Sequence, residues 1–306
     1  MSNNFTEIQY NFCPVCSSPI RKWRVKSSGD NQYIMDLCRT CGFCFVNPRP
    51  SFHFLMEFYA SFGQGSEDSE RKIPDLESVL AQESHDPNST MDARRMIQTI
   101  KSFHNNQTAN KFLDVGCGYG FFSKEALDAG FDVVPLELAE SERKITHELT
   151  GLIPISSSFE EFKVTPESLG VVFMSQILEH ALDVNLWIEK SHDLLIKDGI
   201  IAIALPNFGS LFRIILQENE SFICPPSHLN FFNPNSLLNL LEKHGFKVEA
   251  IQWVSRIPKS TFEKRLPRFL KPLLPFIIWT SSTMLKCIDA LHLGMMITVY
   301  ARKVRS

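Results

Sequence analysis

Four cysteines near the start of the sequence have the spacing of metal ligands. Cys13 and Cys16 are separated by two residues, and Cys38 and Cys41 repeat that spacing after an interval of 21 residues. Two residues between cysteines let a tight turn direct both thiolates at one ion, and two such turns complete a tetrahedral site. The pattern predicts structural zinc with four protein ligands, because the second pair argues against redox-active or free thiols.

A second stretch could hold a ligand through its backbone. Residues 111–115 (KFLDV) are typical of a buried strand, and they lead into three closely spaced glycines, Gly116, Gly118 and Gly120. A helix is expected from residue 121, so its free N–H groups and positive dipole end would face the same place. Glycine lets a ligand approach the backbone closely. The stretch indicates a binding site, although an ordinary strand–turn–helix corner would use the same residues.

Two acids stand where strands are expected to end. A second strand over 131–137 finishes at Glu137, 17 residues after Gly120. An acid at the tip of the second strand can accept two hydrogen bonds from a ribose diol. A solvent-facing carboxylate is the alternative. Asp114 ends the first strand, and we expect it to orient the glycine loop or to meet a ligand's ammonium group.

Strands and helices are expected to alternate along the rest of the chain. Such a pattern forms a parallel sheet covered on both faces, an α/β fold. Ligands bind such sheets at the carboxyl ends of the strands, where Gln176 and Asn207 also fall. The further strands are expected near 153–155, 171–175, 200–205, 247–251 and 297–303, and helices at 92–100, 183–195 and 233–244.

Several motifs together resemble class I S-adenosylmethionine-dependent methyltransferases. Residues 114–120 (DVGCGYG) look like their first motif, and Glu137 matches their ribose acid. Residues 178–180 (LEH) and 195–199 (LIKDG) are similar to their fourth and fifth motifs. The resemblance covers about 105–255 and the last strand. It implies a Rossmann-like sheet of seven strands, the last antiparallel, and S-adenosylmethionine as cofactor. The expected cofactor-binding residues are Asp114, Gly116, Cys117, Gly118, Gly120, Glu137, Leu138 and Gln176.

The cysteine-containing segment carries a second resemblance. With residues 47–50 (NPRP) it is similar to the N-terminal module of some bacterial methyltransferases, including deoxysugar C-methyltransferases and members of surface-polysaccharide gene clusters. This implies a small-molecule acceptor such as a sugar or nucleotide-sugar, methylated on oxygen or carbon. Quinone-pathway O-methyltransferases commonly have an acid three residues before the Glu-His pair and can hold a divalent metal. Gln176 stands in that place here, which weakens a metal role for Glu179 and His180.

Three residues are the candidates for catalysis: Glu179, His180 and His228. In the related methyltransferases, a histidine in the loop that contains residues 225–232 lies over the reacting centre. A neutral imidazole can remove a proton from a hydroxyl group or an activated carbon near pH 7. The alternatives are a structural histidine at 228 and a helix-start network at 179–180.

We expect three regions along the chain. Residues 1–62 form a zinc ribbon, and residues 63–104 form a linker or lid with a lead-in helix. The methyltransferase domain spans 105–306, with a basic and apolar helical insertion at 256–295. The lid expectation rests on eight acids against two bases between Gly63 and Asp92, a composition typical of mobile connections.

Charge and hydropathy limit the partners. The 306 residues carry a net charge of −3, which argues against nucleic acid. The alternative functions are an RNA methyltransferase that uses the zinc ribbon and a non-catalytic S-adenosylmethionine-binding module. Residues 256–285 combine a basic stretch with an apolar one, so they could rest on a membrane surface, cover a lipid-linked substrate or pack on the domain. We read no export signal in residues 1–7 and expect a cytoplasmic protein.

Overall fold

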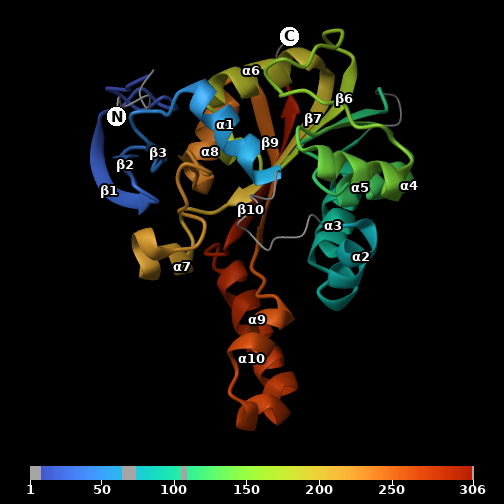
Figure 1. Ribbon diagram of the computed structural model, residues 1–306. Helices are drawn as coiled ribbons and strands as arrows, with labels where there is room; N and C mark the ends of the chain where they lie inside the picture. The colour runs from blue at the N-terminus through green and yellow to red at the C-terminus, as the bar shows by residue number, and fades with distance from the viewer. Residues whose placement is uncertain (1–7, 64–73, 105–108, 305–306) are drawn as a thin grey trace.

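The structure, a computed structural model, describes residues 8–63, 74–104 and 109–304. A six-stranded sheet forms its centre, in the order β5-β4-β6-β7-β10-β9 (Figure 1). Strands β5, β4, β6 and β7 run parallel, and β10 is antiparallel to both of its neighbours. The expected α/β fold with an antiparallel last strand is confirmed. The strands are β4 (Lys111–Val115), β5 (Asp132–Leu136), β6 (Leu169–Ser175), β7 (Leu195–Pro206), β9 (Phe246–Val254) and β10 (Met296–Lys303).

The expected strand near 153–155 is reduced to one contact. Ile155 makes a single parallel bridge to Leu136 at the edge of the sheet. Pro154 has no N–H group to donate to a ladder, and the side chain of Ile153 is 79% exposed. The described part of the sheet therefore has six strands where the sequence resemblance implied seven.

Helices cover both faces of the sheet. On one face, α3 (Asn88–Phe103) and α4 (Phe121–Asp128) share an apolar cluster with alternate residues of the central strands. On the other face, α6 (Val184–Leu194) and α8 (Pro234–Lys243) pack over the remaining strand residues. The side chain of Asn233 accepts a hydrogen bond from the Ser236 N–H at 2.8 Å and so caps α8. The apolar clusters on the two faces hold the strands and helices in place, and so they hold the loops that connect them.

A smaller antiparallel sheet has the order β1-β2-β3-β8. Its first three strands are β1 (Ile20–Ser28), β2 (Asn31–Cys38) and β3 (Cys44–Val46). The fourth, β8 (Asn230–Phe231), comes from the loop beyond β7. The buried Arg49 side chain adds hydrogen bonds from Nη1 to Leu229 O at 2.8 Å and from Nη2 to Asn230 Oδ1 at 2.5 Å. The N-terminal ribbon thus forms one sheet with the segment that contains the candidate base.

The expected linker contains more regular structure than its composition suggests. Helix α1 (Phe52–Gly63) precedes it, and α2 (Leu76–His85) and α3 occupy its described part. The Asp75 side chain caps α2 by accepting from the Ser78 N–H at 2.8 Å, so an acid there serves helix formation. The lid hypothesis falls in large part on residues 64–73, which lie outside the described residues.

The expected insertion between β9 and β10 is helical. It consists of α9 (Lys259–Arg265), the short 3₁₀ helix η3 (Arg268–Leu273) and α10 (Leu274–Ala290). These elements extend away from the sheet as an arm (Figure 1). The remaining elements are α5 (Glu140–Thr150), α7 (Leu211–Leu216) and the 3₁₀ turns η1 (Leu178–His180) and η2 (Gln217–Asn219). Among the helices that the structure describes, none has the length and apolar character needed to cross a bilayer.

Candidate active site and cysteine cluster

The glycine loop joins β4 to α4 at the carboxyl edge of the sheet. Gly116 and Gly120 have φ angles of +69° and +82°, and Gly120 is the N-cap residue of α4. A Cβ at Gly116 would lie 2.8 Å from Ile177 Cδ1, and one at Gly120 would lie 2.8 Å from Thr146 Cγ2. Both positions therefore need glycine for backbone conformation and for space.

Glu137 is in direct contact with this loop. Its Oε2 accepts a hydrogen bond from the Gly118 N–H at 3.0 Å, and its Oε1 accepts from the Ala139 N–H at 2.9 Å. Each carboxylate oxygen has a second lone pair, so both could still accept from a diol. Gly118 and Glu137 are 19 residues apart in sequence, and this hydrogen bond brings them together at one candidate binding site.

The neighbour of Glu137 was missed by sequence reasoning. Glu142, in the first turn of α5, has a pKa raised to about 7 by burial and by the charge of Glu137. Glu142 therefore binds a proton more readily than an exposed glutamate does. The available signal was weak, since an acid in the first turn of a helix is normally read as a dipole partner.

The other expected cofactor residues have different surroundings. Asp114 is buried and accepts a hydrogen bond from Ser123 Oγ at 2.6 Å, so it fixes the start of α4. Burial raises its pKa to about 7. Cys117 is also buried, and its N–H donates to Leu136 O at 2.8 Å. Leu138 and Gln176 are exposed, and Gln176 has a φ of +54° at the end of β6.

The three candidate catalytic side chains come together. A carboxylate oxygen of Glu179 and a ring nitrogen from each of His180 and His228 lie within 4.8 Å of one another. The two imidazole rings meet edge to face at 4.9 Å between centroids. Such a group could hold a divalent ion or act in proton transfer.

The two histidines have different environments. His180 Nδ1 lies 2.7 Å from Ser227 O, and its ring also contacts the backbone of Gln176, so it connects two loops. His228 Nδ1 lies 2.8 Å from Phe222 O. A carbonyl partner requires the proton on Nδ1, which leaves Nε2 of a neutral His228 as an acceptor. Burial and the nearby His180 lower the pKa of His228 to about 4, so it is neutral at pH 7.

Glu179 is the unusual member of the cluster. Its side chain is 1% exposed, and neither carboxyl oxygen has a hydrogen-bond partner among the described residues. Burial raises its pKa to about 8. At pH 7 the group is therefore a neutral acid that can donate a hydrogen bond.

Replacing Glu179 with glutamine should remove a pH dependence of stability. The ordinary glutamate pKa of 4.5 rises to about 8 on folding, so the stabilisation present below the unfolded value is lost as pH rises through the folded value. The free energy of unfolding of the natural chain should fall by a few kcal/mol, at about 1.4 kcal/mol per pKa unit, across that window. Urea unfolding of Glu179→Gln at about pH 5 and about pH 8 should show little of this fall.

The exposed Glu189 provides the matched control for this measurement. Glu189→Gln should retain the slope of the natural chain. An equal slope in Glu179→Gln would contradict the assignment of a buried, neutral carboxyl group.

A small cavity of about 10 Å³, room for about one water molecule, lies beside the catalytic candidates. His228 lines it together with side chains of mixed character from the loops after β7. Among them, the Arg213 guanidinium stacks at 4.3 Å over the Phe208 ring. Burial lowers the pKa of Arg213. The lining residues are Pro206, Asn207, Phe208, Arg213, Glu220, Phe222, Ile223, His228, Asn230 and Phe231.

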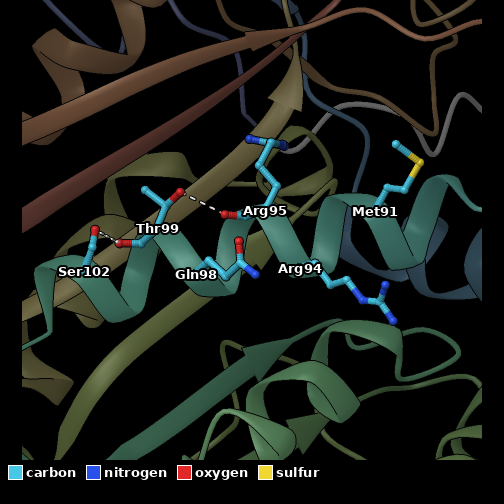
Figure 2. Close-up of a pocket in the computed structure, with 6 residues that line it drawn as sticks. All are labelled: Met91, Arg94, Arg95, Gln98, Thr99 and Ser102. Carbon is cyan, nitrogen blue, oxygen red and sulfur yellow. Dashed lines mark hydrogen bonds between the residues drawn. The ribbon is translucent and has the colours of Figure 1, made fainter.

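A separate hollow follows the outer side of α3. Figure 2 shows its lining, which includes Met91, Arg94, Gln98 and Ser102. Arg95 is already engaged with Asp92 Oδ1 at 3.1 Å and with Gln252. The six lining residues include no acid, histidine or cysteine, so we assign no chemistry to this hollow.

The four N-terminal cysteines form a compact cluster, as their spacing predicted. Cys13 Sγ lies 3.6 Å from Cys41 Sγ, and Cys16 Sγ lies 3.5 Å from Cys38 Sγ. All four sulfurs lie within 4.8 Å of one another. A disulfide would need about 2.05 Å, whereas sulfurs bound to one zinc ion at about 2.3 Å are about 3.8 Å apart in a tetrahedron. The donor set fits a tetrathiolate metal site.

Comparison with known proteins gives one family match. A family model described as a methyltransferase domain matches residues 88–251. The mitochondrial ubiquinone biosynthesis O-methyltransferase of Bos taurus is 27% identical over 156 residues, which cover 46% of this chain and 42% of that protein. The ubiquinone biosynthesis O-methyltransferase of Pelagibacter ubique is 26% identical over 186 residues, covering 53% of this chain and 75% of that one.

The matches are partial in sequence and broader in structure. The chain spans about half the length of the mammalian relatives, 42% for Bos taurus and 50% for Mus musculus. A crystal structure of an S-adenosylmethionine-dependent methyltransferase from Archaeoglobus fulgidus aligns with a TM-score of 0.51 at 18% identity, covering 74% of this chain and 99% of that one. This likeness shows a shared fold.

Proposed function

The chain belongs to the methyltransferase domain family, and from this premise we propose that it is an enzyme that methylates a small molecule with S-adenosylmethionine. The hydrogen bond between the Gly118 N–H and Glu137 carries the proposal. This bond holds Glu137, which could accept hydrogen bonds from a ribose, next to the glycine loop. Both lie at the carboxyl edge of the parallel strands, where such sheets bind their ligands. His228 lines a cavity in the loops beyond the same edge.

The cofactor contacts follow from the geometry of this edge. Glu137 would accept the two ribose hydroxyls, and the exposed Leu138 beside it would pack on the adenine ring. The glycine loop would approach the methionine portion through its backbone, with Gln176 at the end of the next strand. When bound, S-adenosylmethionine supplies an electrophilic methyl group on its sulfonium sulfur.

The acceptor in this proposal is a small molecule that carries a hydroxyl group. The relatives from Bos taurus and Pelagibacter ubique are named O-methyltransferases, which favours oxygen as the acceptor atom. The sequence resemblance of the N-terminal module favours a sugar. Arg213 and Glu220, both in the cavity wall, supply charged groups that suit a polar acceptor.

The roles of the chain's own residues follow from their protonation. Methyl transfer to a hydroxyl oxygen releases a proton, and Nε2 of the neutral His228 would accept it. His180 positions the loop that carries His228 through Ser227. Glu179, as a neutral acid, would donate a hydrogen bond toward the same site. Precise placement of the two reactants provides the rest of the rate enhancement.

Replacing His228 with asparagine should lower the methylation rate and leave cofactor affinity unchanged. Loss of a general base costs about 10²- to 10⁴-fold in rate, whereas the expected cofactor contacts lie at the carboxyl ends of β4, β5 and β6. Methyl transfer from labelled S-adenosylmethionine to a panel of hydroxylated acceptors measures the rate, and calorimetry measures the affinity. Because the pKa of His228 is about 4, the rate of the natural enzyme should decline only as pH falls toward that value.

The exposed His53 on α1 offers the control, since its side chain is far from buried. His53→Asn should match the natural enzyme in both measurements. A rate for His228→Asn equal to that of the control would remove His228 from the mechanism.

We also propose that zinc occupies the cysteine cluster. The ion would be held by Cys13, Cys16, Cys38 and Cys41 and would serve folding, because four protein ligands leave no position for a substrate. The sulfur separations of 3.5 and 3.6 Å support the proposal.

A further inference from the structure

The arm formed by α9, η3 and α10 exposes an apolar stripe. Leu273, Phe276 and Trp279 are 52%, 63% and 65% exposed, and they recur every three residues near the start of α10. The Phe276 and Trp279 rings are neighbours, with centroids 6.1 Å apart. Large aromatic side chains on a projecting element are costly to leave in water. Such a stripe marks a surface that contacts another phase or molecule.

A basic segment precedes the stripe in the sequence. Residues 256–271 contain six bases and one acid, although the whole chain has a net charge of −3. The acid, Glu263, is already paired with Lys259 at 3.6 Å and with His85 at 3.0 Å. Lys264 and Lys271 are exposed. Lysine is depleted in protein interfaces, whereas lysines flanking an aromatic face are typical of helices that lie on anionic membranes.

The root of the arm is held in a defined orientation. Asp86, at the end of α2, accepts hydrogen bonds from the Lys259 N–H at 2.7 Å and the Ser260 N–H at 3.1 Å. Asp289, near the end of α10, accepts from the Ser255 N–H at 3.0 Å and from Ser255 Oγ at 2.6 Å. Both helices of the arm are thus fixed where they leave the domain.

The same root contacts the wall of the candidate acceptor cavity. Asn207 Nδ2 donates to Gly294 O at 2.8 Å, and the Leu211 N–H donates to Leu293 O at 3.0 Å. Helix α7 continues from this contact and exposes Ile214, Ile215 and Leu216. Both α7 and the arm extend from the same side of the molecule (Figure 1). Helix α7 thus exposes further apolar side chains near the root of the arm.

We propose that this arm docks the protein on an anionic lipid bilayer. Leu273, Phe276 and Trp279 enter the boundary between headgroups and acyl chains, and Lys264 and Lys271 meet lipid phosphates. Helix α10 has 17 residues, and no described helix meets the requirements for a membrane span, so the contact is peripheral. Docking tethers the domain, and with it the loops around His228, to the lipid surface. On the basis of the proposed function, the acceptor is then a hydroxylated molecule carried by a lipid.

Flotation of the full chain with vesicles tests the docking. The natural protein should float with vesicles of phosphatidylcholine and phosphatidylglycerol, and much less with phosphatidylcholine alone. Phe276→Ser with Trp279→Ser should weaken binding about tenfold or more, because two interfacial aromatic anchors are lost. Lys264→Glu with Lys271→Glu should also weaken binding, because each lysine near an anionic surface contributes to the attraction. Added salt should reduce the difference between this variant and the natural chain, because salt screens the charges.

Matched controls separate docking from general surface properties. Ile153→Ser removes a more exposed apolar side chain elsewhere, and Lys197→Glu with Lys247→Glu reverses two exposed charges on strands of the central sheet, outside the arm. Both controls should float as the natural chain does. Thermal unfolding and calorimetry with S-adenosylmethionine show that the arm variants remain folded and competent to bind.

The outcomes distinguish the proposal from its competitors. Failure of the natural chain to float on anionic vesicles would overturn it, as would equal flotation of the arm variants. A dimer in light scattering that Trp279→Ser dissociates, without flotation, would assign the stripe to a second copy of the chain. Flotation without any methyl transfer would retain the membrane contact and reject the enzymatic proposal.

Discussion

Serine in place of Cys41 should release zinc from the protein and unfold the sheet β1-β2-β3-β8. The ribbon of residues 1–62 is too small to bury enough apolar surface to fold alone, so the metal supplies free energy of folding. Structural zinc in small domains contributes about 10–16 kcal/mol at pH 7. If only part of this is lost here, the melting temperature should still fall by about 10 °C or more. Elemental analysis and calorimetric melting measure the two effects.

Among the cysteines outside the cluster, the exposed Cys287 supplies a control for this change. Cys44 is buried outside the cluster, and Cys287 is exposed on α10. Cys287→Ser should retain one zinc ion per chain and the natural melting temperature. One zinc ion retained by Cys41→Ser would refute the four-cysteine site. A second equivalent of metal in the natural protein, lost in Glu179→Gln, would place another ion at Glu179, His180 and His228.

Replacing Glu137 with alanine should abolish most of the affinity for S-adenosylmethionine. The carboxylate would make two charge-assisted hydrogen bonds to the ribose, each contributing about 1.5–3 kcal/mol. Their combined loss weakens binding by about 100-fold or more. The same change removes the acceptor of the Gly118 N–H, so the glycine loop also loses its partner. Isothermal titration calorimetry gives the dissociation constant directly.

An acid on the adjoining helix tests whether the effect is local. Glu140 is exposed at the start of α5, and Glu140→Ala should bind the cofactor as the natural chain does. Glu137→Gln should be intermediate, because the amide can still accept from one hydroxyl. Affinity for Glu137→Ala within about twofold of the control would exclude Glu137 from ribose binding.

Local patterns predicted much of the sheet. Strands β4, β5, β6, β7, β9 and β10 lie close to the expected ranges, since each is an apolar run ended by glycine, proline or a polar residue. The sequence left Asn233 and Asn235 as alternative caps of α8, and the structure has Asn233. The strand near 153–155 was the exception, because Pro154 and an exposed Ile153 prevent a ladder that hydropathy alone favoured.

Contacts between distant residues were harder to foresee. Nothing near Asn230 in sequence indicates that it pairs with Phe45, 185 positions earlier. Glu179 and His228 were both expected as catalytic residues. That the Glu179 carboxyl group has no hydrogen-bond partner among the described residues depends on packing from several elements. Long-range burial of this kind leaves no periodic signal in the chain.

The pairing of β8 with β3 has a consequence for how such proteins diversify. Cys44 is paired with Phe231, and Phe45 with Asn230. Arg49 extends this contact through Leu229 O. A gene fusion that replaces only the first 62 codons would remove β3 and Arg49. The segment that contains His228 and β8 would then lack its partner strand. New acceptor preferences should therefore arise when both segments are inherited together, and chimeras between homologues should be assembled with that pair as the unit of exchange.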